Sequence, residues 1–121
     1  MAQKICADAR VPRCVCVYVA GPISKGDMFL NVRAGVLAGE ELRAAGFHPF
    51  VPHLSALWQM IYPVDYEGWM RLDFAWVERC DALLRLPGES SGADREVAHA
   101  EAHGVPVFYD VAALRAAFPE V

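Results

Sequence analysis

The chain alternates between short apolar runs rich in β-branched residues and longer segments in which apolar residues recur every three or four positions. The apolar runs predict strands over residues 15–20, 47–51, 82–86 and 105–109. The helical spacing predicts helices over residues 27–45, 66–80, 92–103 and 111–118. Residues 53–64 are expected to form an aromatic-rich loop or a short helix, and residues 1–12 a loose leader.

This order of elements predicts an α/β fold. Strands that alternate with helices form a parallel sheet covered by helices on both faces, here a three-layer sandwich with four or five strands. A length of 121 residues suits one domain with a single core, so we treat residues 1–121 as one domain. In such sheets ligands bind beyond the carboxyl ends of the strands, where the chain order reverses. The loops after residues 20, 51 and 86 should therefore share one rim.

The segment from Leu86 to Glu96 carries the most specific pattern in the chain. An apolar run stops at Pro-Gly, the hydroxyls of Ser90 and Ser91 follow, and a helix opens with Glu96 about one turn inside. The first N–H groups of a helix lack partners and carry the positive end of its dipole, so this segment suits a phosphate. The alternative is an ordinary strand-to-helix turn in which a serine caps the helix.

Asp73 interrupts an apolar stripe on the helix over residues 66–80. Trp69, Asp73, Trp76 and Cys80 advance by four, three and four positions and so share a face. A carboxylate there is costly unless it is paired or faces a cavity, although hydrogen bonding to backbone groups would also satisfy it. Asp73 and Glu96 near one rim favour glycoside chemistry, in which one carboxylate attacks and the other handles the proton.

Charge and cysteine content exclude several classes of partner. The formal net charge is −4 and the eleven basic residues are scattered, which argues against binding a nucleic-acid polymer. No run approaches the roughly 20 apolar residues of a membrane span, so we expect no membrane partner. The four cysteines show no zinc-type spacing, and we expect reduced thiols in the cytoplasm.

A metal site is not expected. Glu96, His99 and His103 lie at helical offsets that suit a metal ion, but the sequence shows no further ligand near them. His103 has the alternative role of capping the helix before Gly104. The chain also lacks the phosphate-binding and dinucleotide-binding glycine motifs, and we expect no cofactor.

Taken together, the motifs resemble those of the nucleoside 2-deoxyribosyltransferase superfamily. The resemblance rests on Tyr18-Val-Ala-Gly21-Pro22-Ile23-Ser24, Asp73, Cys80-Asp81, Ser90-x-Gly92-x-x-x-Glu96 and Gly104-Val-Pro106-Val. Within that superfamily the chain is most similar to the nucleoside 5′-monophosphate N-glycosidases. The resemblance implies a flavodoxin-like (Rossmann-like) sheet, cleavage of an N-glycosidic bond without a cofactor, and a homodimer or higher oligomer.

The resemblance also assigns roles to residues. Glu96 corresponds to the nucleophile that attacks C1′, and Asp73 to the acid that helps to protonate the departing base. Tyr18 belongs to the same catalytic group, although core packing is the ordinary role of a strand tyrosine. The substrate-binding positions would be Gly21, Pro22, Ile23, Ser24, Trp58, Ser90, Ser91 and Gly92.

Position 90 separates the branches of the superfamily. The transferases that act on free nucleosides carry an acidic residue there, whereas Ser90 beside a helix N-terminus accommodates a phosphate. We therefore expect hydrolysis of a (deoxy)nucleoside 5′-monophosphate. Asp94 departs from the pattern, because it adds a negative charge where the family has a small residue. The alternatives are base exchange between nucleosides, or a non-catalytic sensor of nucleotides or NAD derivatives on the same fold.

Overall fold

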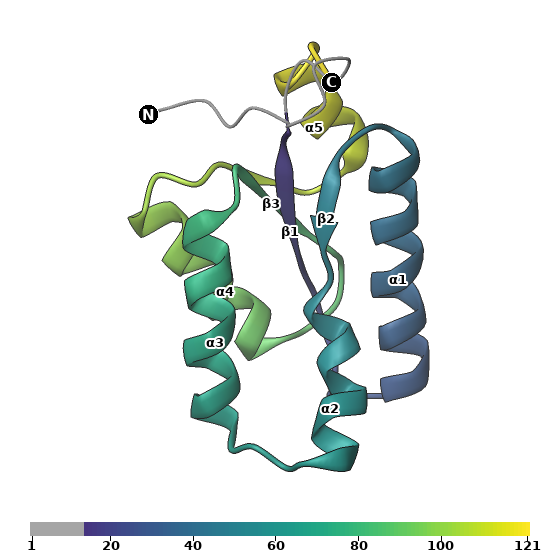
Figure 1. Ribbon diagram of the computed structural model, residues 1–121, viewed down its shortest axis with the longest axis vertical. Coiled ribbons are helices and arrows are strands. Elements are labelled where there is room, and N and C mark those ends of the chain that lie inside the picture. The colour runs from purple at the N-terminus through teal and green to yellow at the C-terminus, as the bar shows by residue number, and fades with distance from the viewer. Residues whose placement is uncertain (1–13) are drawn as a thin grey trace.

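Four parallel strands form the central sheet of the computed structural model, which describes residues 14–121 (Figure 1). The strands are β1 (Cys16–Ala20), β2 (His48–Phe50), β3 (Ala82–Arg85) and β4 (Val107–Phe108), in the order β2-β1-β3-β4. This arrangement confirms the predicted flavodoxin-like α/β fold with a parallel sheet. The expected leader over residues 1–12 lies outside the described residues.

Helices cover both faces of the sheet. Helices α1 (Met28–Ala44) and α5 (Val111–Ala117) contribute Leu42 and Leu114 to the core on one face. On the other face, α3 (Tyr66–Arg79) and α4 (Ser91–Ala102) pack side by side (Figure 1). Successive side chains of a strand point to opposite faces of the sheet, so both faces carry apolar residues for the helices to cover. The fold therefore has the three layers that the sequence predicts.

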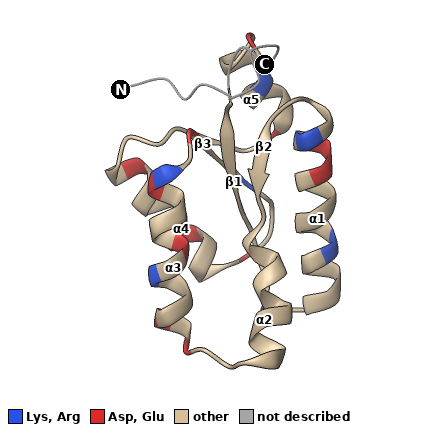
Figure 2. Cartoon of the chain, viewed as in Figure 1, with Lys and Arg blue, Asp and Glu red and all other residues tan. Residues whose placement is uncertain are grey.

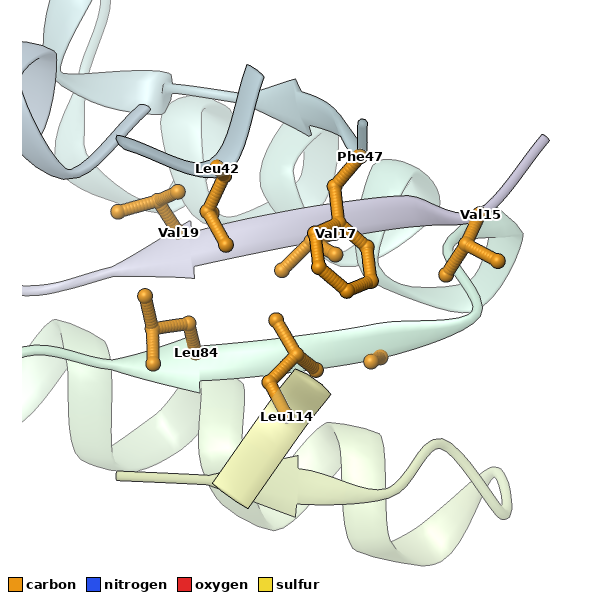
Figure 3. Close-up of a cluster of buried hydrophobic side chains, with 8 residues drawn as sticks. Val15, Val17, Val19, Leu42, Phe47, Leu84 and Leu114 are labelled. Atoms are coloured by element: carbon orange, nitrogen blue, oxygen red, sulfur yellow. The ribbon is translucent and has the colours of Figure 1, made fainter. Parts of the chain in front are cut away.

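The strand β1 shows this alternation most clearly. Val15, Val17 and Val19 point toward α1 and α5, where they meet Phe47 and Leu84 (Figure 3). Tyr18 and the other residues of opposite parity face α3 and α4. Because β1 lies between two other strands, both of its faces are buried, and its sequence is apolar almost throughout.

Two strands are shorter than the predicted runs. Strand β2 covers three residues and β4 two, against the expected ranges 47–51 and 105–109. Proline has no N–H to donate to a ladder, and Pro49 and Pro106 occupy these edge segments. Phe47 and Val105 are nevertheless buried, so the apolar pattern identified these core residues correctly. The prolines limit only the number of residues that form backbone hydrogen bonds with the neighbouring strand.

The segment between β2 and α3 folds as two short helical pieces. A 3₁₀ turn over Pro52–Leu54 leads into α2 (Ser55–Ile61), which has no buried residue. The expectation of a loop or a short helix over residues 53–64 is thus resolved in favour of a helix. Within residues 14–121, no helix combines the length and apolar character that crossing a bilayer requires.

The cysteines differ from one another. Cys14 is disulfide-bonded, whereas neither Cys16 nor Cys80 forms a disulfide. The expectation that all four cysteines are reduced is therefore wrong for Cys14. Cys14 precedes the first residue of β1 and is only half-buried, so the sheet does not enclose its sulfur as a small apolar group.

The chain order reverses between the neighbouring strands β1 and β3. Their following loops start side by side, because Leu86 N donates a 2.7 Å hydrogen bond to Ala20 O. The loop after β1 is held by Asn31 of α1, whose side-chain amide donates to the backbone oxygens of Ile23 and Lys25. These two loops form one rim of the sheet, at the position where ligands bind in folds of this type.

Candidate active site

Tyr18, Asp73 and Glu96 meet at the base of this rim. They come from β1, α3 and α4, respectively, and are 0%, 8% and 5% exposed. The Tyr18 hydroxyl donates a hydrogen bond of 2.5 Å to Glu96 Oε2. The Asp73 carboxyl lies close enough to Glu96 and Tyr18 for both to affect its pKa. Three polar groups thus interact with one another in a nearly dry environment.

The neighbouring residues in the sequence explain why the side chains of Tyr18, Asp73 and Glu96 lie close together. Tyr18 lies on the side of β1 that faces α3 and α4. Glu96 lies between Ala93 and Ala100 on one face of α4, and all three are buried. Such small neighbours allow α4 to pack closely on the sheet, so the longer Glu96 side chain reaches the tyrosine. Asp73 is turned inward with the buried face of α3.

Burial shifts the pKa values of Tyr18, Asp73 and Glu96. Desolvation is the largest cause that raises the pKa of Asp73 and of Glu96 above the usual carboxyl range. The neighbouring Asp73 charge raises the pKa of Glu96 further, whereas the hydrogen bond from Tyr18 opposes this rise. Burial and the adjacent carboxylates also raise the pKa of Tyr18. The two carboxyls therefore share a proton near neutral pH while Tyr18 stays protonated.

Asp73 and Glu96 line a cleft of about 520 Å³. Among the predicted substrate-binding residues, six lie in its wall: Gly21, Ile23, Ser24, Ser90, Ser91 and Gly92. Tyr18 does not line the cleft but lies behind Glu96, to which it donates its hydroxyl proton. The structure therefore brings loops and carboxylates that are up to 75 residues apart into one concave site.

Several lining residues were not expected from the sequence. Helix α2 and the start of α3 provide an apolar wall with polar groups, which consists of Ser55, Ala56, Gln59, Met60, Val64, Tyr66, Trp69 and Met70. Lys25 and Met28 complete the opposite side. The position of α2 relative to the sheet depends on tertiary packing, so residue spacing alone could not place these side chains.

Ser90 has the capping role that the sequence offered as the simpler alternative. Its Oγ accepts a 3.1 Å hydrogen bond from Ala93 N and so caps α4. Ser90 also lines the cleft together with Ser91 and Gly92 at the first turn. The two interpretations are compatible, because the cap fixes the loop while the positive end of the helix faces the cleft.

Asp94 does not direct its charge into the cleft. Its carboxylate lies 3.0 Å from Arg85 Nη2 in an ion pair, and both residues line a separate cavity on the other side of α4. Arg85 also donates to the backbone oxygens of Leu86 and Gly88. The acidic side chain of Asp94 is therefore paired, and this ion pair braces the loop before α4.

Two expected residues lie outside the cleft wall. Trp58 is exposed and contacts Trp69 edge-on, and it is Trp69 that lines the cleft. Of helix α2, Gln59 and Met60 line the cleft where Trp58 does not, so contact between Trp58 and the substrate stays a prediction. Pro22 packs against the neighbouring loop, since a Cβ on Gly88 would lie 2.8 Å from Pro22 Cγ.

The stripe on α3 is also shifted by one position from the predicted one. Its buried residues are Met70, Asp73 and Val77, whereas Trp76 is 43% exposed. Trp76 stacks on Phe50, with ring centroids 5.0 Å apart, and so covers the sheet edge. Asp73 belongs to both versions of the stripe, and for this reason its burial was predicted correctly.

Comparisons with known proteins agree with this fold. Residues 15–109 match the family model described as "Domain of unknown function (DUF4406)". The chain belongs to this family. The fold is similar to a solved structure of a 2-deoxyribosyltransferase from the psychrotolerant bacterium Bacillus psychrosaccharolyticus, with a TM-score of 0.60. That likeness covers 77% of this chain and 69% of the other at 19% identity, which establishes a shared fold. A search of curated proteins gave no match.

Proposed function

We propose that this protein hydrolyses the N-glycosidic bond of a (deoxy)nucleoside 5′-monophosphate. The observation that carries the proposal is the buried group of Tyr18, Asp73 and Glu96 at the base of a cleft that the first turn of α4 also lines. Two carboxyls that share a proton supply the nucleophile and the acid that glycoside cleavage needs. The deoxyribosyltransferase fold is consistent with a nucleoside-related substrate.

The first chemical step forms a bond between Glu96 and the sugar. In the reactive form, the proton that the two carboxyls share has moved from Glu96, whose pKa is the higher of the two, to Asp73. Glu96 is then a carboxylate, whose charge the Tyr18 hydroxyl stabilises. Glu96 Oε attacks C1′ through an oxocarbenium-like transition state, and the C1′–N bond breaks. Its electron pair moves to the base, which takes the proton from Asp73.

The second step returns the protein to its starting state. Water attacks C1′ of the glycosyl ester while the Asp73 carboxylate accepts a proton from that water. The C1′–O bond to Glu96 breaks, the carboxylate is restored, and the sugar 5-phosphate leaves. Asp73 then again shares its proton with Glu96. The net reaction consumes one water and releases one base and one sugar phosphate.

The phosphate is proposed to bind where α4 begins. Backbone N–H groups of the first turn and the hydroxyls of Ser90 and Ser91 adjoin the cleft. Lys25 also lines the cleft and pairs with Glu89 at 2.9 Å, with both side chains largely exposed. In this proposal Lys25 leaves Glu89 and pairs with the phosphate. No acidic side chain of the described loop other than Glu89 competes for it there, because Asp94 is held by Arg85.

Base exchange between nucleosides remains the second candidate. The specific observation in its favour is the likeness to a structure described as a 2-deoxyribosyltransferase. In that reaction an acceptor base replaces water as the group that attacks the glycosyl ester. The serine at position 90 favours the monophosphate reaction, because an acidic side chain at this turn would repel a phosphate whereas a serine hydroxyl can donate a hydrogen bond to it.

We further propose that the protein functions as a homodimer that uses α1 and α2. Helix α2 carries no charged residue, and the first half of α1 is also largely uncharged (Figure 2). Phe29, Met60 and Ile61 are 77%, 75% and 84% exposed. An apolar patch of this kind is typical of a protein interface. Since Met28 and Met60 also line the cleft, a second copy on this face would border the substrate.

The direct test is an assay for free base. The protein is incubated with each nucleoside 5′-monophosphate and, in parallel, with each nucleoside, with and without an added acceptor base. The proposal predicts release of base from at least one monophosphate without an acceptor. Product that forms only in the presence of an acceptor base would instead establish base exchange, and absence of both products would overturn the proposal.

A further inference from the structure

A cluster of metal-binding side chains lies on the outer side of α3 and α4, apart from the cleft. Glu78 of α3 faces His99 and His103 of α4, and one ligand atom from each lies within 4.8 Å of the others. The Nε2 atom of His99 is 2.9 Å from Glu78 Oε2, and that of His103 is 4.0 Å from Glu78 Oε1. Glu96, which the sequence placed with these histidines, is buried in the cleft instead.

The two imidazoles are oriented for binding. His103 Nδ1 lies 2.9 Å from the backbone oxygen of His99. A carbonyl only accepts, so Nδ1 carries the proton and Nε2 keeps its lone pair, as metal-binding histidines require. The ring of His99 stacks between Phe74 and His103, with centroid distances of 4.3 and 4.1 Å. Packing therefore fixes the direction of both rings before any ion binds.

We propose that Glu78, His99 and His103 bind one divalent transition-metal ion that clamps α3 to α4. Two imidazole nitrogens and one carboxylate oxygen form a three-ligand set of the kind that Zn²⁺ accepts, with water as the fourth ligand. Nitrogen ligands favour Zn²⁺, Ni²⁺, Cu²⁺ or Co²⁺ over Mg²⁺ and Ca²⁺, which prefer oxygen. On binding, the proton of His99 Nε2 is lost to water and Nδ1 carries the remaining ring proton. Nε2 and the Glu78 carboxylate then each donate a lone pair to the ion in place of their hydrogen bond.

The location gives this clamp a structural consequence. Glu78 follows Asp73 by five residues on α3, and His99 follows Glu96 by three residues on α4. An ion bound here fixes the spacing of the two helices about one turn from the buried carboxyls. Binding to the folded state alone also raises the free energy of unfolding by linkage. The proposal does not depend on the reaction assigned to the cleft.

Calorimetric titration with Zn²⁺ tests the site, and Mg²⁺ and Ca²⁺ serve as comparison ions. We expect one Zn²⁺ per chain, a rise in the thermal midpoint with Zn²⁺, and no such rise with Mg²⁺ or Ca²⁺. His103→Ala and Glu78→Gln should each weaken Zn²⁺ binding by at least about tenfold. Substitution of a residue that merely hydrogen-bonds to a metal ligand already weakens binding by about that factor. Both side chains are 40% or more exposed, so neither change threatens the fold.

His48→Ala is the matched control, since His48 is an exposed histidine on β2, away from the cluster. It should bind Zn²⁺ as the unaltered protein does. Failure of the unaltered protein to bind Zn²⁺ would overturn the proposal. Undiminished binding by His103→Ala and Glu78→Gln would also overturn it, because the ion would then occupy another site. Circular dichroism of each variant verifies that the compared chains are folded.

Discussion

The hydroxyl of Tyr18 and the carboxylate of Glu96 are joined by a 2.5 Å hydrogen bond between β1 and α4. Tyr18 is fully buried, and its ring stacks on Phe50 with centroids 5.6 Å apart. The donor therefore cannot turn away from Glu96 without disturbing the core. A donor fixed in this way stabilises charge on Glu96 in a dry environment, where such an interaction is stronger than in water.

Tyr18→Phe removes this donor while it preserves the ring. We expect the rate of base release to fall by about a hundredfold, in the range found when one fixed donor to a developing charge is lost. Steady-state kinetics should show the loss mainly in kcat. Tyr109→Phe is the control, because Tyr109 is exposed and lies outside the cleft. Equal rates for Tyr18→Phe and the unaltered protein would rule out a catalytic role for the hydroxyl.

The buried carboxyls should also make stability depend on pH. The pKa is raised to about 6 for Asp73 and to about 8 for Glu96, so folding favours their neutral forms. Their contribution to stability is full below about pH 4, where both are protonated in either state, and is lost as pH rises through the folded pKa values. Glu96→Gln does not titrate, and its thermal midpoint should exceed that of the unaltered protein most clearly near pH 9.

The control for this prediction uses an exposed carboxyl. Glu101 is exposed on the same helix, and Glu101→Gln should leave the pH profile of the thermal midpoint unchanged. A Glu96→Gln variant that loses stability at high pH as steeply as the unaltered protein would show that ionisation of Glu96 does not cause the loss.

The predictions from sequence succeeded where a local pattern was sufficient. The alternation of β1, the proline and glycine turns and the apolar helix faces located the sheet, and with it the rim that holds Ser90 and Glu96. The burial of Asp73 could be predicted because Asp73 lies on the predicted apolar face of the helix and also on the face that is buried in the structure. A carboxylate on such a face is costly unless it has a partner.

The remaining features depend on tertiary packing. Residue spacing did not distinguish Trp58 from Gln59 as a cleft residue, since the direction of α2 follows from its contacts with other elements. Likewise, the pairing of Asp94 with Arg85 joins a helix to the end of β3, nine residues away. Glu78 joins the two histidines only because α3 packs against α4.

Ser90→Asp separates phosphate recognition from helix capping. Aspartate caps a helix as well as serine does, so α4 should remain intact. The added charge would repel a phosphate at the first turn, and kcat/KM for monophosphates should fall by at least about tenfold. Glu89→Gln is the counterpart, because it frees Lys25 from its ion pair and should raise kcat/KM. An unchanged preference for monophosphates in Ser90→Asp would contradict a phosphate site at this turn.

The proposed dimer predicts a mass of about twice 13.3 kDa by light scattering. Ile61→Lys places a charge on the exposed face of α2 and should produce monomers, because an unpaired charge in an apolar interface is costly. Tyr109→Lys is the control, since it alters an exposed aromatic residue away from α1 and α2. A monomeric unaltered protein, or dimers that survive Ile61→Lys, would refute this interface.

In the proposed mechanism, Glu96 forms a covalent bond with C1′ of the sugar. A 2′-fluoro-2′-deoxynucleoside 5′-monophosphate tests it, because fluorine destabilises the oxocarbenium-like transition state and slows hydrolysis of the ester. Peptide mass analysis should find a sugar-phosphate adduct on Glu96, formed as one equivalent of base is released. Release of base without an adduct on Glu96, or no release from any monophosphate, would contradict a covalent mechanism at Glu96.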